Sequence, residues 1–255
     1  MCKIDFSKAD IAGQTNQFSV VRADIPYEDE LPVAVRNLLL SGIEERWKPL
    51  MENRLLLERD ADLEWNWEED VLYPKCYFLG TRDEANSSVL YILRNDGSNR
   101  VEGIARLIHG APTFHLTKKS TRRGTVPVRP KAIYLDAIAV APWNRVSIPP
   151  PERTRDLAKI LLGVSITISK QMGFGGRVTL HAADTAEKWY RQIIPNAKFE
   201  YDRAELRGLQ IQADDPAPKG PYIEIDAEVA HAFLSVNRML LSGVEPIGEC
   251  PTGLI

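Results

Sequence analysis

The feature that most constrains the fold is an almost uninterrupted apolar run at residues 132–140, which Ala141-Pro142-Trp143 closes. A strand that is apolar at successive positions is typical of the centre of a sheet, where both of its faces are covered. Asp136 is the one charged residue within the run. The chain is therefore expected to build a sheet around this strand and to pack other elements against it.

A Pro-rich segment separates this strand from an amphipathic helix. Over residues 157–172, apolar side chains recur at spacings of three and four, and Gly173 follows as a helix-ending residue. A strand at residues 177–181 comes next, and Asp184-Thr185-Ala186-Glu187 predicts the capped start of a short helix. The local order is therefore strand, helix, strand, helix.

The other patterns predict strands before this unit, and one strand with a helix after it. The β-prone runs lie at residues 76–80, 89–93, 101–108 and 222–225. An apolar stripe over residues 229–240 predicts a final helix. Residues 110–130 are rich in Lys, Arg, Thr and Pro without apolar periodicity, which predicts a mobile basic loop. The predicted fold class is α+β, with a largely antiparallel sheet.

The N-terminal part carries weaker signals. An arm, a first strand around Phe18 and partial disorder all fit the polar first residues, and a helical pattern extends over residues 32–57. Trp65 and Trp67 then lie among acidic residues, where indoles typically pack over the edge of a core. We expect an N-terminal arm and helical segment over residues 1–70, packed on a main domain over residues 71–255.

Composition narrows the classes of function. The chain has 32 Lys and Arg against 35 Asp and Glu, so its formal charge of -3 gives no general attraction to nucleic acid or to an anionic membrane. No apolar run is long enough for a membrane span, and the N-terminus lacks the layout of a signal peptide. The three cysteines lie far apart and the four histidines share no spacing, so neither a disulfide framework nor a metal site is expected. We expect a cytoplasmic protein without nucleic-acid or membrane partners, and homodimerisation is left open.

Three sequence runs and the order of the elements carry a family resemblance. The runs are Ala141-Pro142-Trp143-Asn144-Arg145, Gly173-Phe174-Gly175-Gly176-Arg177-Val178-Thr179-Leu180-His181-Ala182 and Tyr222-Ile223-Glu224-Ile225. With the Trp65-Asn66-Trp67 segment upstream, they resemble a poorly characterised bacterial subgroup of the GNAT superfamily of N-acetyltransferases. The resemblance covers about residues 76–234. It implies a GNAT-like mixed, mostly antiparallel twisted sheet flanked by helices, with an N-terminal helical extension.

The resemblance implies binding of acetyl-CoA. In this family the strand that corresponds to residues 133–140 splays away from its parallel neighbour, and its exposed amides bond the pantetheine arm as an added strand would. The pyrophosphate lies on the amides that open the following helix, where the family motif reads Arg/Gln-x-x-Gly-x-Gly/Ala. The implied cofactor contacts are Ile138, Ala139, Val140, Arg153, Arg155, Asp156, Leu157 and Ala158.

The phosphate-binding segment departs from the family motif. Asp156 occupies the first Gly position, and residues 146–152 are inserted before the segment. Backbone amides can bind phosphate beneath a non-Gly residue whose φ is negative, but the carboxylate adds repulsion unless it turns away as an N-cap. Two interpretations stay open: Asp156 merely caps the helix while Arg153 and Arg155 are solvated, or the segment contacts phosphate.

Three residues are candidates for the chemistry of acetyl transfer. Tyr190 matches the family's tyrosine that protonates the departing thiolate, and a phenol with a pKa near ~10 suits this role, although a packed tyrosine is the alternative. Asp136, in apolar surroundings, is either paired or has a raised pKa suited to accepting the amine proton, and Glu102 competes with it. A water chain or an already neutral amine also fits. The family's oxyanion donor is a backbone N–H, by resemblance that of Ala139, Val140 or Ala141.

The expected function is transfer of an acetyl group from acetyl-CoA to an amine by direct attack, on a small molecule or a protein. The alternative is a non-catalytic GNAT-fold protein that acts through CoA binding or protein contacts. The basic run at residues 118–123 fits recruitment of an acidic substrate or tRNA, although such runs are usually solvated. His181, at a strand end, is interpreted as a hydrogen-bonded core histidine.

Overall fold

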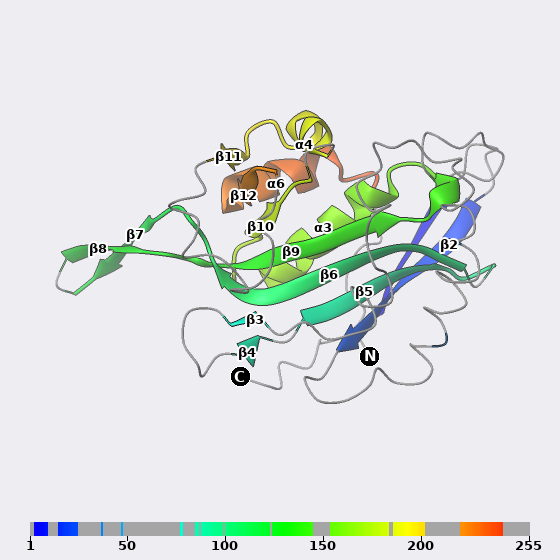
Figure 1. Cartoon of the computed structure of the whole chain (residues 1–255), viewed down its shortest axis with the longest axis horizontal. Coiled ribbons are helices and arrows are strands. Elements are labelled where there is room, and N and C mark those ends of the chain that lie inside the picture. Colours follow the sequence, from blue (N-terminus) through cyan, green and yellow to red (C-terminus); the bar gives the residue numbers. More distant parts are fainter. Residues whose placement is uncertain are drawn as a thin grey trace.

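The structure of the chain is a computed structural model with an α+β fold, which confirms the predicted class (Figure 1). Its largest element is an eight-stranded sheet in the order β1-β2-β5-β6-β9-β10-β12-β11. The residues that the structure describes are 3–9, 15–24, 37, 47, 77–78, 85–86, 88–98, 100–122, 124–144, 154–183, 186–201 and 220–241.

The sheet is antiparallel except where β9 and β10 pair. Its strands are β1 (Lys3–Ala9), β2 (Thr15–Asp24), β5 (Ser88–Asn95), β6 (Arg100–Pro112), β9 (Lys131–Val140), β10 (Val178–His181), β11 (Lys198–Glu200) and β12 (Tyr222–Ile225). Two short hairpins stand apart from it: β3 (Tyr77–Phe78) with β4 (Ala85–Asn86), and β7 (Thr117–Thr121) with β8 (Gly124–Val128). The apolar run at residues 132–140 is thus β9, with strands on both sides of it, as its composition predicts.

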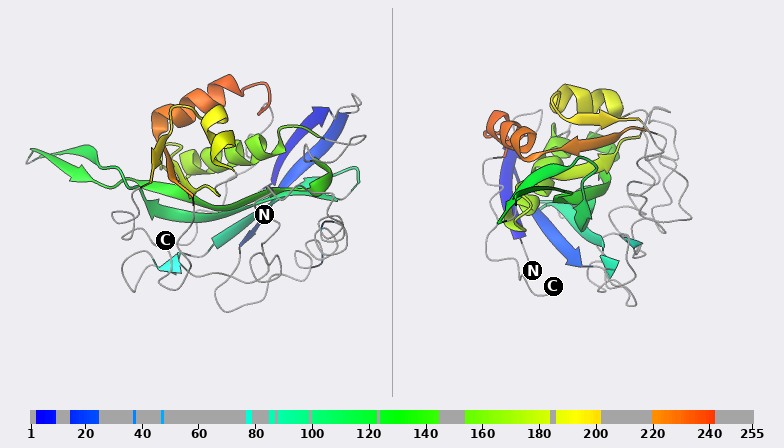
Figure 2. Two further views of the ribbon diagram at one scale, coloured as in Figure 1. Left: turned by 45° about the horizontal axis from the view of Figure 1, so that its top comes forward. Right: turned by 90° about the vertical axis from the view of Figure 1, so that its left-hand side faces the viewer.

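The helices complete the core. They are the 3₁₀ helix η4 (Pro142–Asn144), α3 (Leu157–Gln171), α4 (Glu187–Ile193) and α6 (Ala227–Val236). Helix α3 buries the predicted apolar stripe as far as Ile168, whereas Met172 follows the helix and is exposed. Helix α6 packs beside α3 over the same side of the sheet (Figure 2). Alternate residues of the strands belong to this core, among them Ile133 and Leu135 of β9 and Leu180 of β10. Helix α6 contributes Phe233. Tyr190 of α4 belongs to the same core.

Several sequence predictions need correction. Of the strand predicted at residues 76–80, only Tyr77–Phe78 is a described strand, and it pairs with β4 outside the main sheet, where β2 is the outer neighbour of β5. The final helix ends at Val236, four residues before the end of the predicted stripe, and Val236 and Met239 are both exposed. Ala186, without a side-chain capping bond, is the N-cap of α4. Apart from residues 37 and 47, the predicted helices over residues 32–57 lie outside the described residues, and so do the Trp65 segment and the domain boundary.

Most of the described residues among 110–130 lie in strands rather than in the predicted loop. Strand β6 continues to Pro112, and β7 and β8 then form a hairpin whose turn is closed at Gly124, with φ of 122°. All the described residues of this hairpin except Val128 are exposed, so no face of it required apolar residues. The sequence therefore has none of the alternation that marks a half-buried strand.

Candidate functional site

The parallel strands β9 and β10 pair over only two positions. Ile133 lies opposite Val178 and Tyr134 opposite Thr179, after which β10 continues beside β12 and β9 continues beside β6 as far as Val140. Beyond Tyr134 the two strands therefore diverge (Figure 1). The diverging part of β9 includes Ile138, Ala139 and Val140, the residues expected to contact a cofactor, and Ile138 and Val140 pack on the core shared with α3.

Both candidate bases are the extra residues of β-bulges. In the β6–β9 ladder, Arg106 pairs with Ala137 and the next residue of β6 pairs with Leu135, so Asp136 has no opposite residue. In the β5–β6 ladder, Glu102 is skipped in the same way. A bulge redirects a side chain and breaks the regular alternation of the strand. The sequence shows both carboxylates but gives no sign of the bulges.

Asp136 is paired rather than isolated. Its carboxylate forms an ion pair with Nε of Arg106, and the side chains are 15% and 7% exposed, respectively. Of the two alternatives that its apolar surroundings leave, pairing is the one observed. The carboxylate lies two residues beyond the last β9–β10 pair, at the start of the divergence.

Glu102 is buried and holds several donors. Its Oε2 accepts hydrogen bonds from Nε1 of Trp143 over 2.7 Å and from Nδ2 of Asn144 over 2.6 Å, while Oε1 lies 3.4 Å from Nε of Arg100. Burial raises the pKa of the Glu102 carboxyl, and the hydrogen bonds from Trp143 and Asn144 oppose this rise. Its oxygens are therefore engaged in holding the segment that follows β9.

The hydrogen bonds of Glu102 continue through Asn144 to the segment that precedes α3. Oδ1 of Asn144 accepts a 2.9 Å hydrogen bond from the Thr154 amide, and the Ala141 amide donates to the Glu102 carbonyl over 2.9 Å. We call Glu102, Trp143, Asn144 and Thr154 the Glu102 cluster. It joins β6, the end of β9 and the segment that opens α3, which gives the Trp143-Asn144 motif a structural role.

Asp156 has the backbone conformation of a glycine. Its φ is 64° and its ψ is 14°, and no other non-glycine residue in the described part of the chain has a positive φ. A left-handed backbone costs a non-glycine residue about 1–2 kcal/mol, although aspartate tolerates it better than most residues do. The negative φ named above as a condition for phosphate binding beneath a non-glycine residue is therefore not met at Asp156.

The Asp156 side chain does not cap α3, which contradicts the simpler of the two interpretations. Its Oδ1 lies 3.0 Å from Nζ of Lys159, and it makes no hydrogen bond to the amides of the first helical turn. Leu157 is buried, Ala158 is half-buried and Arg155 is exposed, whereas Arg153 lies outside the described residues. The amides of Leu157 and Ala158 therefore open α3 without a side-chain cap from Asp156.

Tyr190 lies inside the core and is 3% exposed. Its ring meets that of Trp189 edge-on at a centroid distance of 4.8 Å, and among the described residues its hydroxyl has no hydrogen-bond partner. Burial raises the pKa of the Tyr190 phenol. The phenol therefore stays protonated, as a proton donor must be, in surroundings that also suit a packed tyrosine.

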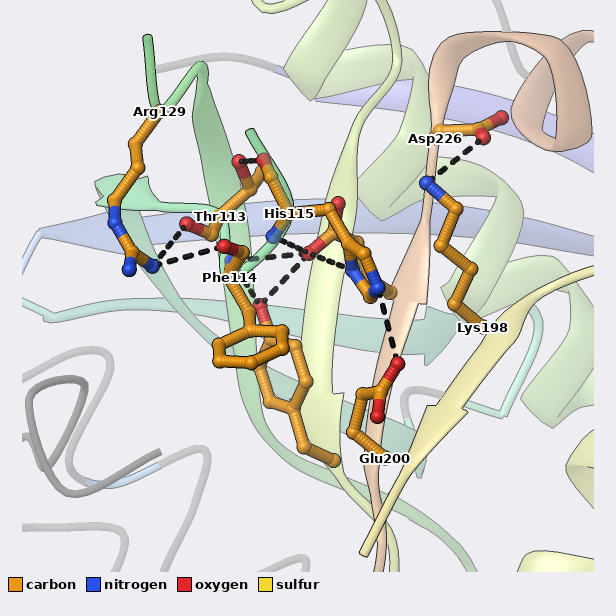
Figure 3. A network of polar contacts seen from close by, with 9 residues as sticks. Thr113, Phe114, His115, Arg129, Lys198, Glu200 and Asp226 are labelled. Atoms are coloured by element: carbon orange, nitrogen blue, oxygen red, sulfur yellow. Dashed lines mark hydrogen bonds and ion pairs between the residues drawn. The ribbon is translucent and has the colours of Figure 1, made fainter. Parts of the chain in front are cut away.

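A polar network on β12 was not predicted from the sequence. Oε2 of Glu224 accepts hydrogen bonds from the amides of Phe114 and His115 over 3.0 and 3.2 Å, and His115 also reaches Glu200 with Nε2 at 3.0 Å (Figure 3). The alternation of Tyr222-Ile223-Glu224-Ile225 was a usable signal, because it places Tyr222 and Glu224 on the face opposite the isoleucines. The network fixes the chain that leaves β6.

His181 is hydrogen-bonded, as interpreted from the sequence. Its Nδ1 lies 2.9 Å from the hydroxyl of Tyr134, and its ring is 5.3 Å from that of Tyr222. Tyr134 belongs to the last β9–β10 pair and His181 ends β10, so this contact lies where the two strands separate.

No family model matches the chain, and neither does any curated protein. A solved structure described as a bacterial toxin is 13% identical, with a TM-score of 0.40 over 85% of this chain and 95% of the other. Within the described residues, no group of His, Cys, Asp and Glu side chains is arranged to hold a metal ion, and no helix there is long and apolar enough to cross a membrane.

Proposed function

We propose that the chain is a GNAT-like N-acetyltransferase that transfers an acetyl group from acetyl-CoA to an amine of a small molecule or a protein. The observation that carries the proposal is the end of β9–β10 pairing after Tyr134 and Thr179. Such a divergence is what the family resemblance implies, because an extended pantetheine arm then bonds to the strand edge of β9 as an added strand.

The start of α3 supports a pyrophosphate site. A left-handed residue directly before a helix turns successive backbone N–H groups into one concavity, and the helix dipole favours an anion there. Asp156 supplies that conformation, and Lys159 lies against its carboxylate. The chain thus keeps the glycine-like backbone without the glycine, while the ion pair offsets part of the repulsion between the carboxylate and phosphate.

The proposed reaction is direct attack of the amine nitrogen on the thioester carbonyl carbon. The new C–N bond forms, the C–S bond breaks, and the thiolate takes the proton of the Tyr190 phenol. Asp136 is the proposed acceptor of the amine proton, because it lies on the diverging part of β9. Glu102 instead positions the loop before α3, since its oxygens hold Trp143 and Asn144.

One observation favours a second candidate, a GNAT-fold protein that binds CoA without catalysis. Tyr190 is almost fully buried and its hydroxyl contacts none of the described polar groups, which a purely structural tyrosine would also show. In that case acetyl-CoA binding would persist while acetyl transfer would not occur.

Titration with acetyl-CoA, followed by thermal unfolding, tests the proposal. A ligand that binds only the folded state stabilises it by about 2.7 kcal/mol at a hundredfold excess over Kd, so the midpoint of unfolding must rise. Ala158→Pro is the informative variant, because proline in the first helical turn removes one amide donor that the helix does not use. The shift should fall for this variant. No shift in the unmodified protein at saturating acetyl-CoA would refute both the enzyme and the CoA-binding candidate.

A further inference from the structure

The β7–β8 hairpin extends away from the body of the protein (Figures 1 and 2). We call residues 117–128 the basic arm. Its charged residues are basic throughout, and no Asp or Glu occurs anywhere between Glu102 and Asp136. Lys118, Lys119 and Arg122 are exposed, and none of the three forms an ion pair or hydrogen bond with another side chain of the described part of the chain. The described side chains of the arm therefore lie outside the core, and no described side chain compensates their positive charge.

The base of the arm is fixed to the body. The Thr113 amide donates a hydrogen bond to the Pro130 carbonyl over 3.0 Å. This bond joins the segment that enters the arm to the segment that leaves it. Nη1 of Arg129 donates to the carbonyls of Thr113 and Phe114 over 3.2 and 2.9 Å, and its guanidinium lies 5.7 Å from the centroid of the Phe114 ring (Figure 3).

Glu224 strengthens this attachment from the sheet. Its buried carboxylate accepts from the amides of Phe114 and His115, so the segment before β7 is tied to β12. An arm that is already ordered at its base loses less conformational freedom on binding than a mobile loop would. The basic run is therefore part of an ordered hairpin rather than a loop, and its described basic side chains are exposed to solvent.

The charges of the arm lie on both of its faces. Lys118 pairs with Pro127 and Lys119 with Val126, and successive residues of a strand point to opposite faces. Each face thus carries one lysine, and Arg122 is placed at the tip. A flat acidic surface could meet only one of these faces, whereas a groove with negative walls meets both.

We propose that the basic arm inserts into a groove of a nucleic-acid duplex, with phosphates on both sides of the ribbon. The major groove of B-form DNA, about 12 Å wide, admits a two-stranded β-ribbon, and each neutralised phosphate releases counterions. The net charge of -3, from which no such partner was expected, describes the whole chain. Over a Debye length of about 10 Å, the local charge of the arm determines the attraction instead. This inference is independent of acetyl-CoA binding.

Fluorescence anisotropy with labelled duplexes of about 20 base pairs, or two helical turns, tests the proposal. DNA and RNA duplexes of one sequence distinguish the two sources of the same phosphate chemistry, and single strands serve as the third probe. The arm variant is Lys118→Gln/Lys119→Gln/Arg122→Gln. The matched control, with the same loss of charge at exposed positions on the body, is Lys170→Gln/Lys188→Gln/Arg238→Gln.

We expect the arm variant to bind duplex at least roughly tenfold more weakly, with a slope of log K against log salt smaller by about 2.7 for a B-form duplex. The control should bind like the unmodified protein, and circular dichroism should show both variants to be folded. The single variants Lys118→Gln and Lys119→Gln should weaken duplex binding to a similar extent as each other, because the groove contacts both faces of the arm.

Any one of the following results would overturn the proposal. They are no duplex binding by the unmodified protein at about 50 mM salt, equal binding by the arm variant and the control, a loss confined to one of the two lysines, and displacement of the duplex by polyglutamate as effectively as by unlabelled duplex. The last result would indicate an acidic protein partner. Binding of single strands as tightly as duplex would also contradict insertion into a groove.

Discussion

Asn144 both donates to Glu102 and accepts from the backbone of α3's leading segment, so one side chain connects a buried carboxylate with the amide of Thr154. The geometry is 2.6 Å from Asn144 Nδ2 to Glu102 Oε2 and 2.9 Å from the Thr154 amide to Asn144 Oδ1. The segment that leads into the proposed pyrophosphate site is therefore held, through Asn144, by the Glu102 carboxylate of β6.

Asn144→Ala should destabilise the protein by about 2–3 kcal/mol, because it leaves a buried amide without its acceptor and removes a donor from a buried carboxylate. Glu102→Gln should cost less, about 1 kcal/mol or below, since its carbonyl oxygen still accepts from Trp143 and Asn144. Urea denaturation measures both free energies of unfolding. Equal losses for the two variants would argue against the role of Asn144 as the link.

Stability should depend on pH through Glu102. Because burial raises the pKa of this carboxyl in the folded state above its ordinary value of 4.5, the folded protein holds this proton more tightly than the unfolded chain does. The contribution of Glu102 to stability is therefore full below pH 4.5 and is lost as the pH rises through the folded-state pKa. Denaturation over a pH series should show the unmodified protein losing stability relative to Glu102→Gln across that window. A constant difference between the two proteins would contradict the shift.

Asp156→Gly should be more stable than Asp156→Ala by about 1 kcal/mol or more, because only glycine adopts the left-handed backbone without strain. Thermal or urea unfolding gives this difference directly, and equal stabilities would show that the position is unstrained. If the proposed pyrophosphate site is correct, Asp156→Gly should also bind acetyl-CoA about fourfold more tightly, since one negative charge near the phosphates is removed.

Tyr190→Phe should leave the free energy of unfolding within about 0.5 kcal/mol of the original, because no described group bonds to the hydroxyl. If Tyr190 protonates the thiolate, the same change should lower the rate of acetyl transfer about a hundredfold. Acetylation of a mixed library of amines, followed by mass spectrometry, provides the assay. Tyr190→Ala serves as the packing control and should cost about 3–5 kcal/mol. An unaltered rate in Tyr190→Phe would remove Tyr190 from the mechanism.

Arg106→Met should destabilise the fold by about 3 kcal/mol, because it leaves the mostly buried Asp136 carboxylate without its cation. The double variant Arg106→Met/Asp136→Leu should recover most of this loss, since an apolar pair carries no desolvation penalty. Chemical denaturation of the three proteins completes the cycle. If the double variant is no more stable than Arg106→Met, the ion pair is not the reason for the loss.

The best-predicted elements are those with strong periodicity. The strand β9, the helix α3 and the strand β10 follow from apolar spacing alone, because each of them buries a continuous set of side chains. The β7–β8 hairpin was missed for the opposite reason: both of its faces are exposed, so packing imposed no pattern on its residues.

The site was less predictable because its key features are conformational. Nothing in the residues around Asp156 specifies a positive φ, and the family motif suggests one only through a glycine that this chain lacks. Likewise, the charge of Asp136 within an apolar strand indicated that a partner was needed, but the identity of Arg106 depends on the register of β6 against β9. Pairing register depends on the apolar patterns of both strands and on the connection between them, so the residues around Asp136 alone do not specify it.

The short pairing between β9 and β10 also has a mechanical consequence. One leaf of the sheet runs from β1 to β9 and the other comprises β10, β12 and β11, and the seam between them is only two residue pairs long, at Ile133–Val178 and Tyr134–Thr179. The ladders within the leaves are longer at every other junction. The softest deformation of the sheet is therefore a change in the angle between two stiff leaves. A ligand that binds between β9 and β10 can change that angle while each leaf keeps its own hydrogen bonds.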